Sequence, residues 1–290
     1  MVFRCEGDNL EEIPELIVEK TGLTFPMAHC TEESISILSR ELKEYKKDIL
    51  CRVPFCVTVE AEALGANIKL GDMKTGPRVE SYAFNSIEEL SNLKPMDLEK
   101  GRIKEVLASV EELSSRGETV ALSVEGPFTI ISSLIDPMIF YRAMRKEKEQ
   151  VLRLLKVIED SLVNYILEGI KRGAKIISYG DPVGALEIVG PKVYKEYSGS
   201  TTYNILKRVE PKLSESVIHI CGKTSSAFES MGLSKTEAIY LEESLTYGEA
   251  IDNILQYRKD VKLIGNACIK RSPLKMKTPV VWKMELNKLS

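Results

Sequence analysis

A histidine and a cysteine two residues apart, His219 and Cys221, are the side chains in this sequence best suited to chemistry. They lie in the apolar segment Ser-Val-Ile-His-Ile-Cys-Gly at 216–222, which is typical of a buried strand. Alternate side chains of a strand point to the same face, so the two would face one way. Imidazole and thiolate are good zinc ligands, and this spacing lets one ion bind both. The segment therefore predicts a zinc site; the alternative is a buried thiol beside a hydrogen-bonded core histidine.

A catalytic zinc usually has three protein ligands and an open fourth position, so a further ligand is expected. Cys268 follows a predicted strand at 261–265. Glu242 or Glu243 follows a predicted strand at 238–241, which we expect to lie between the strands at 216–221 and 261–265. The alternative for Cys268 is an ordinary loop thiol. His29 is expected to be a structural hydrogen-bonding residue. The remaining cysteines show no ligand spacing and are expected to be buried free thiols: Cys5, Cys30, Cys51 and Cys56.

The elements that would position these residues alternate between apolar strands and long amphipathic helices. Strands are predicted within 48–59 and at 119–126, 175–179, 216–221, 238–241 and 261–265; helices are predicted at 96–117, 141–172 and 191–209. Such alternation indicates an α/β fold with a parallel sheet. Polar residues gather at the carboxyl ends of the strands, where barrels have their active sites, and the chain has no Gly-rich phosphate loop. A TIM (β/α)8-type barrel over one domain, 1–290, is therefore predicted.

Composition excludes several classes of protein. The 290 residues include 40 Lys+Arg and 43 Asp+Glu, a net charge of −3 that argues against nucleic acid as the main partner. The sequence contains neither a membrane-spanning apolar run nor a signal peptide, so a cytoplasmic protein that does not bind membranes is expected. Six cysteines in a chain of this length are not a disulfide framework. The Tyr- and Leu-rich helices leave room for a homodimer surface.

Short stretches resemble the uroporphyrinogen decarboxylase superfamily, and within it the methylcobalamin:coenzyme M methyltransferases. In the family's order they are Ala-His-Cys-Thr at 28–31, Arg-Val-Pro-Phe-Cys-Val-Thr-Val-Glu-Ala-Glu-Ala-Leu-Gly at 52–65, Val-Glu-Gly-Pro-Phe-Thr at 124–129, Asp-Pro at 181–182, His-Ile-Cys-Gly at 219–222 and Ile-Gly-Asn at 264–266. The decarboxylases begin with an Arg-rich segment that receives substrate carboxylates. This sequence has none near its N-terminus, which favours the methyltransferase branch.

The resemblance implies a zinc-binding barrel enzyme that moves a methyl group from a methylated corrinoid, such as methylcobalamin, to an acceptor thiol such as coenzyme M. A small corrinoid protein would present the methyl group. The family's zinc ligands carry over onto His219 and Cys221. Its third ligand, a Cys in a late Gly-Cys-Gly segment, has no counterpart here. Three explanations stay open: the chain is C-terminally truncated relative to the family and lacks the last strand–helix unit, Cys268 serves as the third ligand, or the zinc site is incomplete.

The same resemblance assigns roles around the expected barrel mouth. Glu125, Asp181 and Asn266 are expected to line the opening that the methyl-corrinoid reaches, and Asp181 is also expected among the catalytic residues with His219 and Cys221. The alternative for these three polar residues is helix capping or loop hydrogen bonding. Two other functions stay open. One is a uroporphyrinogen-type decarboxylase, which needs a basic cluster around the cavity and no metal; the other is a non-catalytic subunit that binds a corrinoid protein.

Overall fold

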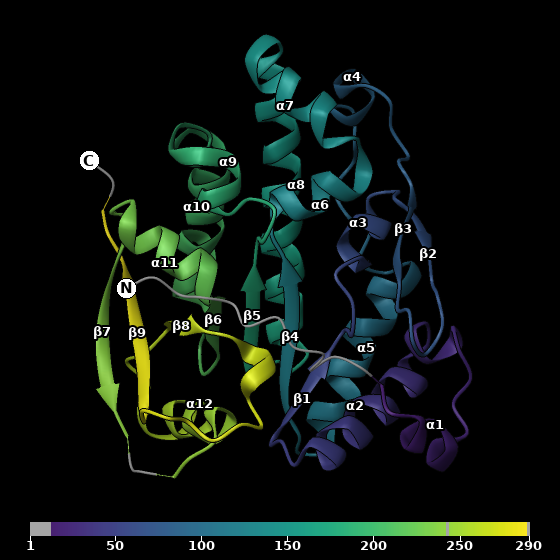
Figure 1. Cartoon of the computed structure of the whole chain (residues 1–290), viewed down its shortest axis with the longest axis vertical. Coiled ribbons are helices and arrows are strands. Elements are labelled where there is room, and N and C mark those ends of the chain that lie inside the picture. The colour runs from purple at the N-terminus through teal and green to yellow at the C-terminus, as the bar shows by residue number, and fades with distance from the viewer. Residues whose placement is uncertain (1–12, 242–243, 289–290) are drawn as a thin grey trace.

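A computed structural model describes residues 13–241 and 244–288 and has a seven-stranded sheet at its centre (Figure 1). Five parallel neighbours come first: β1 (Leu50–Val53), β4 (Thr119–Glu125), β5 (Ile176–Gly180), β6 (Val217–Cys221) and β8 (Leu263–Ala267). The antiparallel strand β9 (Val280–Leu286) follows β8, and β7 (Ser234–Tyr240) pairs with its other edge. A separate two-stranded ribbon joins β2 (Asn67–Lys69) and β3 (Arg78–Ser81).

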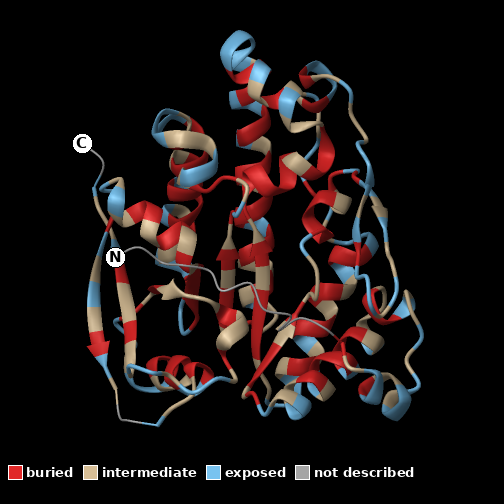
Figure 2. Ribbon diagram, in the orientation of Figure 1, coloured by how far each residue is buried: buried red, intermediate tan, exposed pale blue. Residues whose placement is uncertain are grey.

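Helices cover one face of the sheet almost completely. The helices are α1 (Glu15–Thr21), α2 (Glu32–Lys46), α3 (Val59–Ala63), α4 (Ile87–Leu90), α5 (Gly101–Ser115), α6 (Pro127–Leu134), α7 (Pro137–Lys146), α8 (Lys148–Lys171), α9 (Leu186–Val193), α10 (Gly199–Val209), α11 (Gly222–Ser230) and α12 (Tyr247–Tyr257). The helix α8 runs behind the central strands and packs on them through a buried apolar face, while its other face is exposed (Figures 1 and 2). In the part of the chain that the structure describes, no helix is long and apolar enough to span a bilayer.

The predicted alternation of strands and helices is confirmed, with three corrections. The helix expected at 141–172 is two helices that meet at Glu147, and its residue Leu152 is exposed because Val151 and Leu154 take the buried positions. The helix expected at 191–209 is interrupted by a π-helical segment at 194–198 and preceded by a kink at Gly190, whose φ is +76°.

The third correction concerns the order of strands. The predicted strand at 238–241 overlaps the end of β7, which stops at Tyr240, and it does not lie between β6 and β8, which pair directly with each other. The unpredicted strand β9 lies between β8 and β7 instead. Strands β1 and β7 are the two edges of the sheet, so the strands that the structure describes form an open sheet and not a closed barrel.

The other face of the sheet, which only α12 covers in part, carries every second side chain of each strand. These side chains form two layers along the strands. Near the amino ends of the strands the layer is apolar, and α12 packs on it through Ala250, Ile251 and Ile254. The strand residues of this layer are Leu50, Ala121, Ile176, Val217 and Ile264. One pleat further along each strand, the inward side chains become polar: Arg52, Ser123, Ser178 and His219.

The segment 268–279, which connects β8 to β9, crosses this open face and reaches β1. The hydroxyl of Ser272 donates a hydrogen bond to Oδ2 of the buried Asp48, whose Oδ1 accepts from the backbone N–H of Ile49 at 2.8 Å. The backbone N–H of Gly248, in the first turn of α12, donates to the carbonyl of Ser272 at 2.8 Å. A Cβ on Gly248 would lie 2.9 Å from Asp48 Oδ1, so this junction has no room for a larger residue.

We expect the change Ser272→Ala to lower the free energy of unfolding by about 1–3 kcal/mol, because it leaves a buried carboxylate oxygen of Asp48 without its donor. Chemical denaturation measures this loss. The matched control is Ser115→Ala, on the exposed surface of α5, which should change stability by less than about 0.5 kcal/mol. Equal effects of the two changes would contradict the role given to the Ser272–Asp48 contact.

Candidate active site

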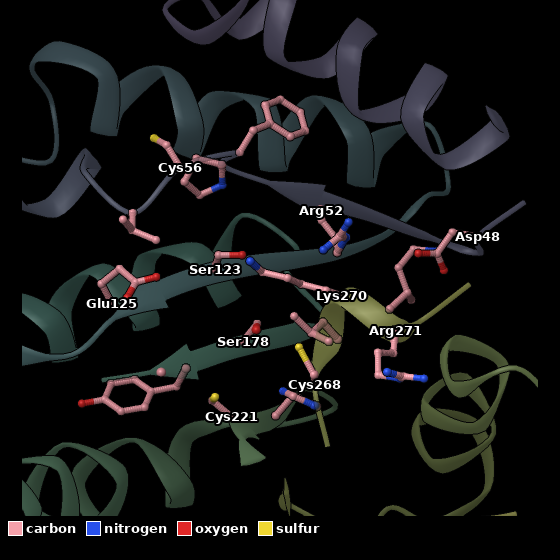
Figure 3. Close-up of a pocket in the computed structure, with 18 of the residues that line it drawn as sticks. Asp48, Arg52, Cys56, Ser123, Glu125, Ser178, Cys221, Cys268, Lys270 and Arg271 are labelled. Atoms are coloured by element: carbon pink, nitrogen blue, oxygen red, sulfur yellow. The ribbon is translucent and has the colours of Figure 1, made fainter. Parts of the chain in front are cut away.

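A cavity of about 510 Å³ lies on the uncovered face of the sheet, above the apolar layer that α12 covers (Figure 3). Its wall comes from α2, from the ends of β1, β4, β5 and β6, and from the segment after β8. The chemically relevant lining residues are Lys43, Lys46, Asp48, Arg52, Cys56, Ser123, Glu125, Ser178, His219, Cys221, Lys223, Cys268, Lys270, Arg271 and Lys277. Four residues predicted from the sequence therefore share one cavity: His219, Cys221, Cys268 and Glu125.

His219 is the most unusual of these residues. Its side chain is 1% exposed, and among the described residues neither ring nitrogen has a hydrogen-bond partner. Its ring meets that of Tyr247, on α12, edge to face at 5.7 Å between centroids. Burial lowers the pKa of His219 to about 4, so the imidazole is neutral at physiological pH. The alternative, a core histidine held by hydrogen bonds, does not fit these two nitrogens. A buried, neutral imidazole without such bonds fits a metal ligand better.

The two candidate thiols come from neighbouring strands. Cys221 ends β6, and its register partner is Ala267, the residue before Cys268. Both thiols belong to half-buried cysteines that form no disulfide and line the cavity, on the side of β6 and β8 (Figure 3). Gly180 makes room for this site, because a Cβ there would lie 3.2 Å from the Cβ of Cys221.

A complete set of zinc ligands is not assembled among the described residues: within 13–241 and 244–288, no three His, Cys, Asp or Glu side chains gather closely enough to hold a metal ion. Glu242 and Glu243, the acidic candidates for the third ligand, lie outside the described residues. The imidazole of His219 and the thiol of Cys221 are donor types that suit zinc. Neither imidazole nitrogen has a partner among the described residues, so one of them is available to a metal ion. The third ligand stays a prediction.

Asp181 has a well-defined structural position. Its buried carboxylate accepts hydrogen bonds from the backbone N–H groups of Phe128 and Thr129, at 3.1 and 2.8 Å, and from the Thr129 hydroxyl at 2.8 Å. It thus caps the first turn of α6 from the neighbouring strand. Burial raises its pKa, and these hydrogen bonds act against that rise. Asp181 is not among the residues that line the cavity, and its proposed catalytic and corrinoid-lining roles stay predictions.

Asn266 also lies beside the cavity and not in its wall. Its backbone N–H donates to Ser225 Oγ at 2.7 Å, and its Oδ1 accepts from the same hydroxyl at 3.0 Å. The residue has a φ of +54°, a left-handed conformation that asparagine tolerates better than most residues. These contacts join β8 to α11. They agree with the alternative expected for Asn266, a structural hydrogen-bonding role, and its contact with a corrinoid stays a prediction.

Glu125 lies at the carboxyl end of β4 and points into the cavity (Figure 3). Its backbone N–H donates to Oε1 of the buried Glu60 at 2.9 Å. Burial raises the pKa of Glu60 to about 7, and the bond from Glu125 acts against that rise. The position of Glu125 agrees with a place at the mouth, although its contact with a corrinoid stays a prediction.

The other residues that the sequence singled out have varied surroundings. Cys51 is fully buried as expected, whereas Cys30 and Cys56 are only half-buried. Cys56 is part of the cavity wall, where it accepts from Arg102 at 3.4 Å. Cys5 lies outside the described residues. His29 is buried against the rings of Phe25 and Phe55, and its Nε2 has no hydrogen-bond partner among the described residues.

Sequence reasoning missed the basic residues of the cavity. Seven Lys and Arg side chains line it, against two acidic ones, Asp48 and Glu125. Arg52 could have been found, because strand alternation places it on the same face as Leu50. Lys270, Arg271 and Lys277 lie on a connection without periodicity, so no pattern indicates that they reach the cavity.

Comparison with known proteins agrees with this geometry. Residues 11–268 match the family described as Uroporphyrinogen decarboxylase (URO-D). The chain belongs to the uroporphyrinogen decarboxylase family. The resemblance read from the short motifs is thus confirmed, and the matched range contains His219, Cys221 and Cys268.

Relatives within this family are named methyltransferases. The chain is 28% identical to "Methylcobamide:CoM methyltransferase MtbA" of Methanosarcina acetivorans over 252 residues, which is 86% of this chain and 73% of that protein. It is 24% identical to "Methylcobamide:CoM methyltransferase MtaA" of Methanosarcina barkeri over 278 residues, 92% of this chain and 80% of that protein. The predicted resemblance to this branch is confirmed.

A solved structure shows the shared fold. A methyltransferase from Methanosarcina mazei superposes with a TM-score of 0.63 at 22% identity, covering 71% of this chain and 60% of that chain. The match thus spans less than two thirds of that structure. The α/β, TIM-barrel-type fold predicted from the sequence is confirmed, in a form whose described strands do not close.

We expect Asp181→Ala to lower the free energy of unfolding by about 3 kcal/mol or more, because it leaves the first turn of α6 without its buried acceptor. Thr129→Val is the matched control: it removes one hydroxyl donor to Asp181 and keeps the backbone bonds, so it should cost about 1 kcal/mol. Thermal and urea denaturation compare the two proteins. A fully stable Asp181→Ala protein would contradict the capping role.

A second prediction concerns stability in acid. Burial, and next the charge of Arg102, lower the pKa of His29 from 6.5 to about 4. Between these pH values the unfolded chain binds the proton and the folded chain does not, so stability falls as the pH falls from 6.5 to 4. The loss from this residue is on the order of 3 kcal/mol. His29→Phe, which keeps an aromatic ring between Phe25 and Phe55, should flatten the pH dependence of the urea midpoint; an unchanged slope would refute this cause.

Proposed function

We propose that this protein transfers a methyl group from a methylated corrinoid to a small thiol acceptor such as coenzyme M, with zinc bound at His219 and Cys221. The observation that carries the proposal is the buried imidazole of His219, which has no hydrogen-bond partner among the described residues and shares one cavity with the thiols of Cys221 and Cys268. The names of the methylcobamide:CoM methyltransferase relatives support the same activity. A small corrinoid protein is the proposed partner, and a cytoplasmic homodimer is the proposed form.

The residues present suit the proposed zinc in their chemistry. Because its pKa is lowered to about 4, His219 offers a neutral nitrogen lone pair at physiological pH, which is the form that binds metals. Cys221 supplies a thiolate from the same face of β6. Cys268 is the proposed third ligand, since it lines the same cavity from the next strand. When bound, zinc would hold the acceptor thiol as a thiolate, which is the nucleophilic form.

The protein's own residues would position the acceptor. The apolar layer beneath the cavity closes its floor, so the acceptor enters from the mouth at the carboxyl ends of the strands or past α2. A volume of about 510 Å³ suits a small thiol, whereas a whole corrinoid is larger and would stay at the mouth on its carrier protein. Glu125 and the half-buried Cys56 lie where the methyl group would approach.

One observation favours a different function. A uroporphyrinogen-type decarboxylase needs a basic cavity, and seven Lys and Arg residues line this one. The incomplete set of metal ligands among the described residues supports a decarboxylase, or a non-catalytic corrinoid-protein-binding subunit, equally. The methyltransferase remains the better proposal, because neither alternative accounts for a neutral buried imidazole beside two thiols.

The test is the zinc content of the purified protein, measured by elemental analysis after zinc is supplied and excess removed. We expect about one zinc per chain in the natural protein. We expect loss of that zinc in Cys221→Ser and in Cys268→Ser. The matched control is Cys30→Ser, whose half-buried thiol lies outside the cavity and should keep the zinc.

Each outcome decides between the proposals. Loss of zinc only in Cys221→Ser would keep the site and assign the third ligand elsewhere. A protein without zinc would overturn the mechanism and favour a decarboxylase or a corrinoid-protein-binding subunit. Transfer of the methyl group from methylcobalamin to coenzyme M, followed by the spectrum of the released corrinoid, then tests the activity itself.

A further inference from the structure

Strand β7 (Ser234–Tyr240) is an edge strand of the central sheet and lies at the left border of Figure 1. Its inner side pairs with β9 along its whole length, without a bulge. No strand within 13–241 or 244–288 pairs with its outer side. The outer side therefore presents a row of backbone N–H and C=O groups with which another strand can pair.

Two hydrogen bonds just beyond the ends of β7 show which of its backbone groups point outward. The N–H of Leu241 donates to the carbonyl of Pro279 at 2.9 Å. At the other end, the N–H of Asn287 donates to the carbonyl of Leu233 at 2.9 Å. Because such groups alternate along an antiparallel strand, the odd-numbered residues direct theirs toward β9. The even-numbered residues direct theirs to the outer edge: Ser234, Thr236, Ala238 and Tyr240.

Opposite charges lie side by side on one face of β7 and β9. The register places Lys235 opposite Glu285. It also places Glu237 opposite Lys283, with 4.0 Å between their charged groups. Lys235 and Glu237 are exposed, and they share a face because they are two residues apart. A second copy of β7, running antiparallel beside the first, presents the same two charges in the reverse order.

One register of such a pairing matches these charges. If two β7 strands pair about a two-fold axis at Thr236, Lys235 lies opposite the partner's Glu237 on both sides of the axis. These positions have no backbone hydrogen bonds between them, and there the side chains of a pair lie closest. An axis at Glu237 would place two carboxylates opposite each other, and an axis at Lys235 two ammonium groups, which is unfavourable in both cases. An axis at Ala238 pairs no charges.

We propose that β7 binds a second copy of this chain, by antiparallel pairing of the two β7 strands about Thr236. Across four strands the charges then change sign at each step: Glu285, Lys235, the partner's Glu237 and the partner's Lys283. Ser234 is buried, so the hydrogen-bonded ladder is short and the charge pairs decide the register. The homodimer of the proposed function, on which this proposal rests, thus gains an interface that depends on neither zinc nor methyl transfer.

Sedimentation velocity of the full chain, at about 1–200 µM protein, tests the pairing. We expect a reversible dimer that weakens as NaCl rises from about 50 to about 500 mM, because salt screens exposed charge pairs. Lys235→Glu alone and Glu237→Lys alone should each weaken the dimer about tenfold, since each change places like charges opposite each other across the axis. An equimolar mixture of the two variants should recover the affinity, because one strand then carries two acids and the other two bases.

The mixture separates pairing between chains from effects within one chain. Each variant also places a like charge against β9, and mixing does not relieve that repulsion. The control Lys69→Glu, on the exposed strand β2, changes the net charge as Lys235→Glu does and should leave the dimer unchanged. A monomer throughout this range, a dimer that neither variant weakens, or a mixture no better than its parts would overturn the proposal. Zinc content, measured on the same variants, should stay that of the natural protein, so the two proposals fail independently.

Discussion

The alternation of side chains along the parallel strands is the constraint on which the rest of this structure depends. Because every second residue of β1, β4, β5, β6 and β8 points to the same face, one pleat fixes an apolar layer and the next pleat a polar one. The apolar layer needs cover, and α12 supplies it. The polar layer is left above that cover, and its side chains line the cavity.

The segment after β8 couples three features of the site. It carries the thiol of Cys268 and the ammonium group of Lys270 into the cavity, and two residues later Ser272 donates a hydrogen bond to Asp48, just before β1. The hydrogen bond of Ser272 therefore connects the segment after β8 to the residues before β1, at the other side of the parallel strands. Any displacement of this contact would also move Cys268, the proposed third metal ligand.

Local patterns in the sequence were sufficient for some of these features. The two-residue spacing of His219 and Cys221 predicted one face, and the structure places both in the cavity. Strand and helix positions followed from apolar periodicity. The order of β7, β9 and β8 did not, because it depends on pairing between segments far apart in the chain. The strand β9 was missed although Val280, Val281 and Trp282, directly after Pro279, are typical of a strand. Helix capping was one expected role of Asp181. The sequence did not indicate which helix it caps, because Phe128 and Thr129 lie more than 50 residues away in the chain.

Two electrostatic effects meet in the cavity, and they act on different groups. Burial holds His219 neutral, so it adds no positive charge to a hollow that already holds seven cationic side chains. Those cations, in turn, favour negative charge anywhere in the cavity, including the thiolate form of a bound thiol. A neutral donor beside basic side chains is thus a consistent arrangement: the imidazole remains available as a ligand, while the nearby positive charges favour the ionised sulfur of a bound thiol. An acidic wall around the same His219 and Cys221 would oppose both effects.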